Sequence, residues 1–469
     1  MNYKILSKNA LAAFLSQGVS MGISILMSLI VPKVLGVQEY GYWQLFIFYA
    51  SYSGLFLFGL NDGIYLISGG KSRSEIDKQS IGSQFRVGAA FQLLIAAIVA
   101  IGGLCLTSEW ERSYVLVTLG LYISINNLTG YIGYVFQAMN ETRRFSFSIV
   151  LDRLTFLVPL LFMVILRVSD FRPYVIAYLA SKTISLAWCC WEARDILSAP
   201  PLSASEAVRE SIASIRVGFK LMIANVADML ILGVARALVD AVWGIEAFGR
   251  VSFSLSLVNF FITFVTQASM VLFPALRQSD EGERRAVYRG MRDAMEAAFP
   301  AVYALYFPMA WLLSVWLPQY AESMRWLAVL LPVCVFNTKM DVCCTTYFKV
   351  LRQERTLLAI NIVTVAASAV TSLVGVFALG SLEAVLVGAV CCIAARSAWS
   401  ELRLDRELDV ARSPMLVPEL LLTAAFVLLA LLLPGMWALP AYCILYGAYL
   451  FANRGEVASI VARVKKVAR

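Results

Sequence analysis

Several ionisable side chains of this sequence lie inside long apolar runs. Lys182 and Lys339 each lie near the middle of such a run, and Asp228 is the most centrally placed carboxylate. A charge at the centre of a membrane helix costs about 2.5–3.5 kcal/mol, so such a residue usually faces a partner or a water-filled cavity. The chemistry that these residues could perform is binding, because lysines suit an anion and a carboxylate suits a proton or a small cation.

Lys182 belongs to a stripe of polar side chains. Three neighbours share its face of the predicted helix, at spacings of three or four residues: Tyr174, Tyr178 and Ser185. One interpretation is a cationic stripe in a cavity that binds a pyrophosphate or sugar hydroxyls. The alternative is a structural lysine that bonds to a neighbouring helix.

A second polar cluster surrounds Lys339. Asn337, Asp341 and Thr345 lie four residues apart on one side of the same predicted helix. Lys339 lies about 200° from Asp341 around that helix, so the two cannot pair within it. Either the segment contributes a substrate site, with Asp341 as a candidate for ion coupling, or its charges make two separate contacts with other helices.

Asn225 and Asp228 are three residues apart and share one face of a predicted helix. This pair could bind a coupling cation or proton. Alternatively, Asp228 could neutralise a buried lysine or arginine on another helix.

Four further polar residues are candidates for lining a substrate cavity. Asn61 and Asp62 lie between two glycines, where small residues allow helices to approach closely. The alternative for this pair is a kink that serves packing. Arg153 lies about two turns inside a predicted helix, and Arg396 lies towards the inner end of another. We expect at least one of the two arginines to face the cavity.

The residue types that catalysis needs are scarce. The sequence has no histidine, which is the commonest general acid or base. Its nine cysteines do not have the spacing of a metal site, and no GxxxxGK[ST] loop for a nucleotide is present. The sequence therefore predicts a protein that is not an enzyme, holds no metal and no cofactor, and does not use ATP.

The composition is that of an integral membrane protein. Of the 469 residues, 60% are hydrophobic and 15% are charged, whereas soluble domains have roughly 45–50% and about 25%. A membrane helix needs about 20 apolar residues. The predicted fold class is therefore an all-α membrane protein of about fourteen transmembrane helices, near 10–31, 42–68, 85–106, 114–138, 147–167, 173–191, 217–238, 248–273, 295–317, 324–348, 356–379, 382–400, 416–434 and 436–452.

The predicted organisation has two lobes of six helices each. The segment between them contains Pro200 and Pro201 and is either a short interfacial helix or a solvated linker. The predicted parts are an N-terminal lobe over 1–191, a cytoplasmic linker over 192–216, a second lobe over 217–400, two further helices over 416–452 and a basic tail over 453–469.

The distribution of lysine and arginine predicts the orientation. If the N-terminus lies in the cytoplasm, most of the Lys and Arg residues between predicted helices also lie there, as the positive-inside rule requires. The outside loops are all short and hold few: Lys33, Arg112, Arg167 and Arg172. Both termini are therefore predicted to be cytoplasmic, and the net charge of +8 reflects this topology rather than nucleic-acid binding.

A short motif occurs twice, once after the first predicted helix and once after the seventh. Gly36-Val37-Gln38-Glu39-Tyr40-Gly41 and Gly244-Ile245-Glu246-Ala247-Phe248-Gly249 share the pattern Gly-[Val/Ile]-x-x-[Tyr/Phe]-Gly. Both copies lie on the predicted outside face. The two lobes are therefore predicted to be parallel repeats, related by a pseudo-two-fold axis along the membrane normal, as in alternating-access transporters.

The run from Val31 to Lys71 resembles the opening of bacterial oligosaccharide flippases. These form the polysaccharide-transport branch of the multidrug/oligosaccharidyl-lipid/polysaccharide exporter superfamily. The stretch Gly59-Leu60-Asn61-Asp62-Gly63 resembles their glycine motif, and Phe273-Pro274-Ala275-Leu276 before a basic loop resembles the end of their eighth helix. The second lobe departs from the pattern, because its eighth helix lacks the glycine motif.

This resemblance implies a function and a location. It implies a multi-pass protein of the bacterial cytoplasmic membrane that flips a polyprenyl-pyrophosphate-linked oligosaccharide from the inner to the outer leaflet for cell-surface polysaccharide export. The implied partners are this substrate, membrane lipid and other polysaccharide-assembly proteins, and no nucleic acid.

Two other functions compete with the flippase. A drug or cation antiporter of the same superfamily would need an acidic cleft, whereas this chain carries central lysines. A membrane polymerase or ligase of lipid-linked glycans usually needs a sizeable outer loop with acid and base residues, and the predicted outer loops are short.

Overall fold

The computed structural model describes residues 22–24, 26–278, 281–433 and 435–467. Within these residues all regular secondary structure is helical. Eight of the described helices are long and apolar enough to cross a membrane, or nine if the bent pair 22–29 and 31–57 forms one span. The predicted all-α membrane fold is therefore confirmed. The first predicted span, 10–31, lies mostly outside the described residues.

Contacts divide the chain into two compact units, Met1–Val226 and Ala227–Arg469. The boundary falls within one long helix, α9 (Ala204–Gln278), whereas the sequence places a linker over 192–216. The first unit contains α2 (Val31–Ser51), η1 (Ser53–Leu57), α3 (Leu60–Ser68), α4 (Lys78–Leu106), α5 (Trp110–Ala138), α6 (Thr142–Ile165), α7 (Phe171–Glu192), α8 (Arg194–Leu197) and the beginning of α9.

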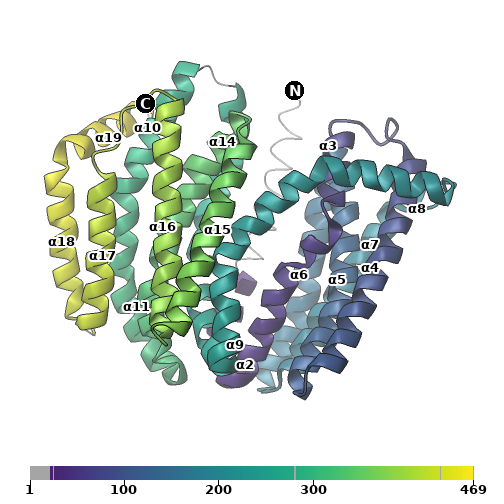
Figure 1. Ribbon diagram of the computed structural model, residues 1–469, viewed down its shortest axis with the longest axis horizontal. Coiled ribbons are helices and arrows are strands. Elements are labelled where there is room, and N and C mark those ends of the chain that lie inside the picture. Colours follow the sequence, from purple (N-terminus) through teal and green to yellow (C-terminus); the bar gives the residue numbers. More distant parts are fainter. Residues whose placement is uncertain (1–21, 25, 279–280, 434, 468–469) are drawn as a thin grey trace. The chain divides into compact units, whose positions relative to one another are not determined.

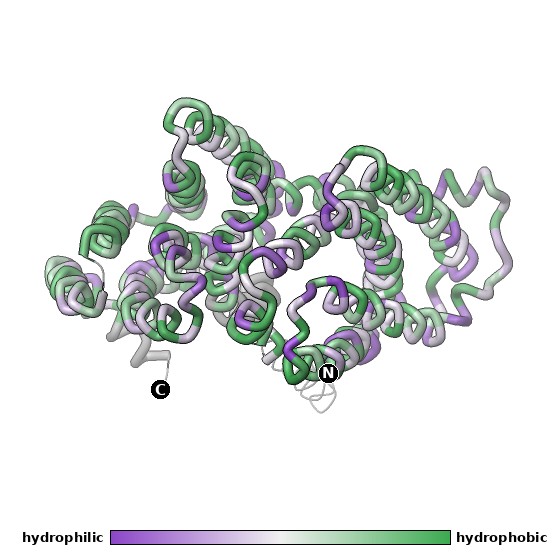
Figure 2. Tube along the Cα trace, turned by 90° about the horizontal axis from the view of Figure 1, so that it is seen from below, coloured by the Kyte–Doolittle hydropathy of each residue, from purple (hydrophilic) through white to green (hydrophobic). Residues whose placement is uncertain are grey.

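In the first unit, α4 packs along α5 and α6 packs along α7, while α5 also contacts α2, α3 and α7. These helices run side by side in Figure 1. Helix α4 is covered little by the other helices: only 17% of its most apolar stretch is buried. Figure 2 shows hydrophobic residues along most of the helices, as a chain surrounded by lipid requires.

The second unit contains the rest of α9 and the remaining helices. They are α10 (Glu281–Ala298), η2 (Phe299–Ala301), α11 (Val302–Trp316), η3 (Pro318–Tyr320), α12 (Ser323–Leu330), α13 (Pro332–Lys339), η4 (Met340–Thr345), α14 (Thr346–Val350), α15 (Glu354–Phe377), α16 (Leu382–Glu407), α17 (Leu416–Leu432), α18 (Ala438–Ala452) and α19 (Arg454–Val467).

The helical run from Ser323 to Val350, made of α12, α13, η4 and α14, is the most enclosed of this unit. Of its most apolar stretch 89% is buried, against 33% for α15. Helices α12 and α13 and the π-helical segment η4 all pack on α16. Helix α17 packs on α12 and α18. Polar residues in the 323–350 run therefore meet protein on most sides.

The repeated glycine motif adopts the same backbone turn in both units. Gly36 interrupts α2 with φ 77° and ψ 179°, and Gly244 interrupts α9 with φ 79° and ψ −176°. Residues with a side chain rarely adopt this positive φ, which explains the glycine. The aromatic residue of each copy, Tyr40 or Phe248, is fully buried. The repeat predicted from six residues thus corresponds to one local structure formed twice.

The glycine motif of α3 permits a close helix crossing within the first unit. A Cβ atom on Gly63 would lie 1.9 Å from the backbone oxygen of Ser214 on α9. Only glycine allows two backbones to approach so closely. This crossing holds the beginning of α9 against α3.

Candidate substrate-binding site

A buried ion pair joins two helices of the first unit. Asp152 lies on α6, and Lys182 lies on the adjacent α7, with 2.9 Å between Lys182 Nζ and Asp152 Oδ2. Ser181 donates a hydrogen bond to the other carboxylate oxygen at 3.1 Å. Both oxygens of Asp152 are thus held by α7. The side chain of Lys182 remains 16% exposed, and that of Asp152 only 6%.

An aromatic cluster lies beside this pair. The Tyr178 ring stacks on Tyr122 at a centroid distance of 5.7 Å and meets Trp43 and Phe156 edge-on at 5.8 and 5.3 Å. Lys182 Nζ lies 5.8 Å from the Tyr178 ring centre, within the range of a cation–π interaction. Rings from α2, α5, α6 and α7 therefore form one wall next to the charged groups.

Arg153 supplies a positive charge that this cluster does not neutralise. It follows Asp152 on α6 and is partly buried. Its Nε is buried and has no hydrogen-bond partner, and in the part of the chain that the structure describes Arg153 forms no ion pair. With Asp152 engaged by Lys182, the three charges leave one net positive charge. A group of this kind suits an anion, which a guanidinium binds through two parallel hydrogen bonds.

The predicted stripe around Lys182 needs a correction. Tyr174 and Ser185 are fully buried and bond to backbone oxygens of Val168 and Ser148, at 3.1 and 3.0 Å. This face of α7 therefore packs on its neighbours and does not line a cavity along its length. Lys182 has a partner on the adjacent helix, as the structural alternative predicts, but its side chain remains partly exposed.

In the second unit, Asp228 and Arg396 form an ion pair. Arg396 Nη1 donates to Asp228 Oδ1, and Nη2 donates to Asn337 Oδ1 at 3.1 Å. The Arg396 side chain is 2% exposed, whereas that of Asp228 is 47% exposed. Arg396 thus lies in the interior of the unit and its charge is neutralised, which corrects the expectation that it binds substrate. Of the two arginines, Arg153 alone keeps an unpaired charge.

The remaining ion-coupling candidates form no ion pair with Arg396, but Asp341 lies close enough to Asp228 and Arg396 to interact electrostatically with both. Asn225 is exposed on α9, at the end of the first unit. Asp341 is partly buried in η4 and forms no ion pair among the described residues. Because residues 340–345 are π-helical, the regular spacing assumed for Asn337, Asp341 and Thr345 does not hold there.

Lys339 is not available to a substrate. It is 1% exposed, and its Nζ lies 2.8, 2.6 and 2.9 Å from carboxylate oxygens of Glu296, Glu401 and Glu419. The expectation that Lys339 lines a cleft is therefore wrong for this structure, because three carboxylates surround its ammonium group. Sequence reasoning missed all three partners, which lie close to the ends of predicted helices and resemble interfacial residues there.

Asn61 and Asp62 lie in the first turn of α3, at the crossing with α9. Asn61 is 5% exposed, and its Oδ1 is buried without a hydrogen-bond partner. Asp62 is partly buried. The glycines around them serve packing, as the second interpretation of this motif predicts, and the two side chains remain candidates for contact with substrate.

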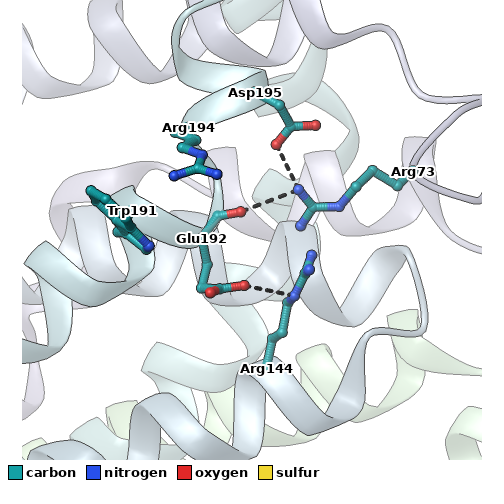
Figure 3. Close-up of a pocket in the computed structure, with 6 residues that line it drawn as sticks. All are labelled: Arg73, Arg144, Trp191, Glu192, Arg194 and Asp195. Carbon is teal, nitrogen blue, oxygen red and sulfur yellow. Dashed lines mark hydrogen bonds and ion pairs between the residues drawn. The ribbon is translucent and has the colours of Figure 1, made fainter.

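A charged pocket of about 300 Å³ lies in the first unit, where the 71–77 loop and the first turn of α6 meet the end of α7 and α8. Figure 3 shows Arg73 directed towards Asp195 and Arg144 directed towards Glu192. Arg73 also binds both oxygens of Glu141, at 2.8 and 2.7 Å.

The ion pairs of this pocket perturb its carboxylates. Burial raises the pKa of Glu141, but its hydrogen bonds with Arg73 and Arg144 outweigh burial and hold the pKa below its ordinary value. Burial also raises the pKa of Asp195, but its interactions with Lys78 and Arg73 outweigh burial and hold this pKa below its ordinary value. Arg73 and Arg144 are already paired with acidic side chains. Their ion pairs therefore hold together the chain segments that line the pocket.

Comparison with known proteins identifies the fold. Neither a protein-family model nor a curated protein matches the sequence. The chain is similar in structure to the lipid II flippase MurJ in an inward closed conformation, with a TM-score of 0.65 and 10% identity over 96% of this chain and 99% of the flippase. It is also similar to an inward-facing multidrug resistance MATE family transporter of the MOP superfamily, with a TM-score of 0.61 and 12% identity over 85% of this chain and 99% of that one. A MATE structure in the straight conformation is similar with a TM-score of 0.53 and 12% identity, over 85% of this chain and 95% of that one. The chain thus has the fold of MOP-superfamily transporters.

Proposed function

We propose that this protein is a flippase that moves a polyprenyl-pyrophosphate-linked oligosaccharide from the inner to the outer leaflet by alternating access. The fold supports transport, since the solved structures that resemble it are described as transporters and as a flippase. The observation that carries the choice of an anionic substrate is the unpaired guanidinium of Arg153 beside the Lys182–Asp152 pair.

Each part of such a substrate has a suitable environment in this proposal. The prenyl chain stays in lipid, where it loses no hydrophobic contacts. The pyrophosphate accepts hydrogen bonds from Arg153, and from Lys182 when the ammonium group turns from Asp152. Sugar rings stack on aromatic side chains, for which the partly exposed Tyr178 is the nearest candidate. Asn61 and Asp62 offer further hydrogen bonds to hydroxyl groups.

The direction of transport agrees with the membrane potential. When the cell interior is negative, an anion that leaves gains roughly 2.3 kcal/mol per charge per 100 mV. Coupling to a cation through Asp228 is a separate proposal, and it fails if Asp228→Asn keeps both normal transport and an unchanged ion dependence.

The test is leaflet-specific detection of the lipid-linked saccharide in cells that lack the protein. The flippase proposal predicts accumulation on the inner leaflet. Arg153→Gln should reduce the flipping rate about 10–100-fold, since a charge-assisted hydrogen bond contributes about 1.5–3 kcal/mol. Arg209→Gln, which removes an exposed charge from the same unit, is the matched control and should transport normally.

The outcomes separate the rival functions. Normal export of the saccharide with sensitivity to cationic drugs alone would reject the flippase and indicate an antiporter. Accumulation of unpolymerised saccharide on the outer leaflet would indicate a polymerase or ligase.

A further inference from the structure

The second unit buries more negative than positive charge at one point. Lys339 on α13 is surrounded by Glu296 on α10, Glu401 on α16 and Glu419 on α17. None of these four side chains is more than 1% exposed. If all three carboxyl groups were ionised, three negative charges would face one ammonium group, with no solvent to screen them.

Neighbouring groups do not remove this excess. Next to the cluster, Arg292 pairs with Asp405 and Asp293 at 2.6 and 2.9 Å, and Arg289 approaches Asp293 at 3.7 Å. Two arginines therefore face two aspartates, and that group is balanced by itself. The other titratable or hydroxyl-bearing side chains that face the cluster carry no formal charge: Cys343 and Cys344 from η4, Tyr288 from α10, Tyr303 from α11, Ser413 before α17 and Tyr449 from α18.

Three carboxylate oxygens in the cluster accept no hydrogen bond. Lys339 donates to Oε1 of Glu296 and to Oε2 of Glu419, and it forms an ion pair with Oε2 of Glu401. Ser413 donates to the second oxygen of Glu296. Both carboxylate oxygens of Glu401 and Oε1 of Glu419 are buried and accept no hydrogen bond. A buried carboxylate oxygen without a donor is costly, and a proton on the carboxyl group removes that cost.

The geometry favours a proton over a metal ion. The carboxyl groups converge on the ammonium group of Lys339, which occupies the centre that a cation would need. Within the described residues no group of acidic, cysteine or histidine side chains has the arrangement of a metal site.

We propose that Glu296, Glu401 and Glu419 around Lys339 form a proton-binding site, in which at least one carboxyl group carries an exchangeable proton at neutral pH. The site lies in the second unit and is distinct from the charged residues to which we assign substrate binding. Loss of the proton would make the carboxylates of α10, α16 and α17 repel one another. Occupancy of the site is thereby linked to the packing of α17 on the rest of the unit.

The test uses the full-length protein in lipid nanodiscs, with no substrate present. Infrared difference spectra between neutral and alkaline pH report the carbonyl stretch of protonated carboxyl groups. We expect such a band at neutral pH that disappears as the pH rises. It should lose most of its intensity in Glu401→Gln or Glu419→Gln, whereas Glu354→Gln, an exposed control on α15, should keep it.

A second variant keeps the test decisive if a glutamine variant does not fold. Lys339→Met removes the sole positive charge of the cluster, so its glutamates should hold more protons and the band should grow. The proposal is wrong if wild-type protein shows no protonated carboxyl band at neutral pH, or if Glu401→Gln and Glu419→Gln both retain it in full. Because no substrate is used, this result is independent of whether the protein flips a lipid-linked saccharide.

Discussion

Removal of the Lys182 charge should destabilise the first unit by about 3 kcal/mol. At 2.9 Å, two unit charges attract by about 6 kcal/mol with an effective dielectric constant of 20, before the cost of desolvation. Breaking one partner of a buried pair typically costs about 3–5 kcal/mol, because the other charge is left alone. The partial exposure of Lys182 and the hydrogen bond that Ser181 keeps with Asp152 favour the lower end of that range.

The measurement is a double-mutant cycle on purified protein in detergent. Lys182→Met and Asp152→Asn should each lower the free energy of unfolding, while the double variant should lose less than the sum of the two, with a coupling of about 2 kcal/mol. Lys220→Met, which removes an exposed lysine from α9, is the control and should change stability little. If both single variants are as stable as wild type, or if their effects simply add, the ion pair does not stabilise the unit.

Three further predictions test the packing and the charges. Gly63→Leu should lower the free energy of unfolding by about 1–3 kcal/mol, because the leucine side chain would overlap the backbone of α9. Gly54→Leu is the control and should change stability little, because there is open space beside Gly54. Thermal unfolding measures both variants. Asp228→Asn should lower the free energy of unfolding more than Arg396→Met does. The first change leaves a buried guanidinium unpaired, whereas the second leaves a half-exposed carboxylate that water can solvate. Equal losses of stability in the two variants would contradict this difference in burial. The lowered pKa of Glu141 means that its contribution is complete above its unfolded pKa of about 4.3 and is lost as the pH falls through the folded value. Stability measured on acidification should therefore decline less steeply in Glu141→Gln than in wild type, and an unchanged profile would count against this ion pair.

Much of the fold could be predicted without coordinates. Among the described residues, each predicted span from 42–68 onward is mostly helical, with non-helical residues at some ends and at a turn within 42–68. The prediction works because a bilayer forces every backbone group to bond within its own helix, so apolar length alone locates a span. The turn at Gly36 and Gly244 was predictable for a similar reason, since a positive φ selects glycine.

The sequence predicted charged residues that belong to the candidate site, but it did not predict which side chains form ion pairs with one another. Lys182 and Arg153 were both predicted from the sequence as charged residues within membrane helices. Their distance depends on how α6 and α7 pack, which helical periodicity does not give. For the same reason Arg396 was a candidate for substrate binding, although its partner on α9 lies far away in the chain.

Lys339 shows most clearly what each level decides. The sequence alone determined that a lysine lies within an apolar helix and therefore needs compensation, because no ammonium group is stable in hydrocarbon. Only the tertiary structure decided that three glutamates from three other helices provide it, since helix packing brings together residues separated by up to 80 positions along the chain. Local sequence fixes the need for a partner, and the identity of that partner follows from the packing of helices.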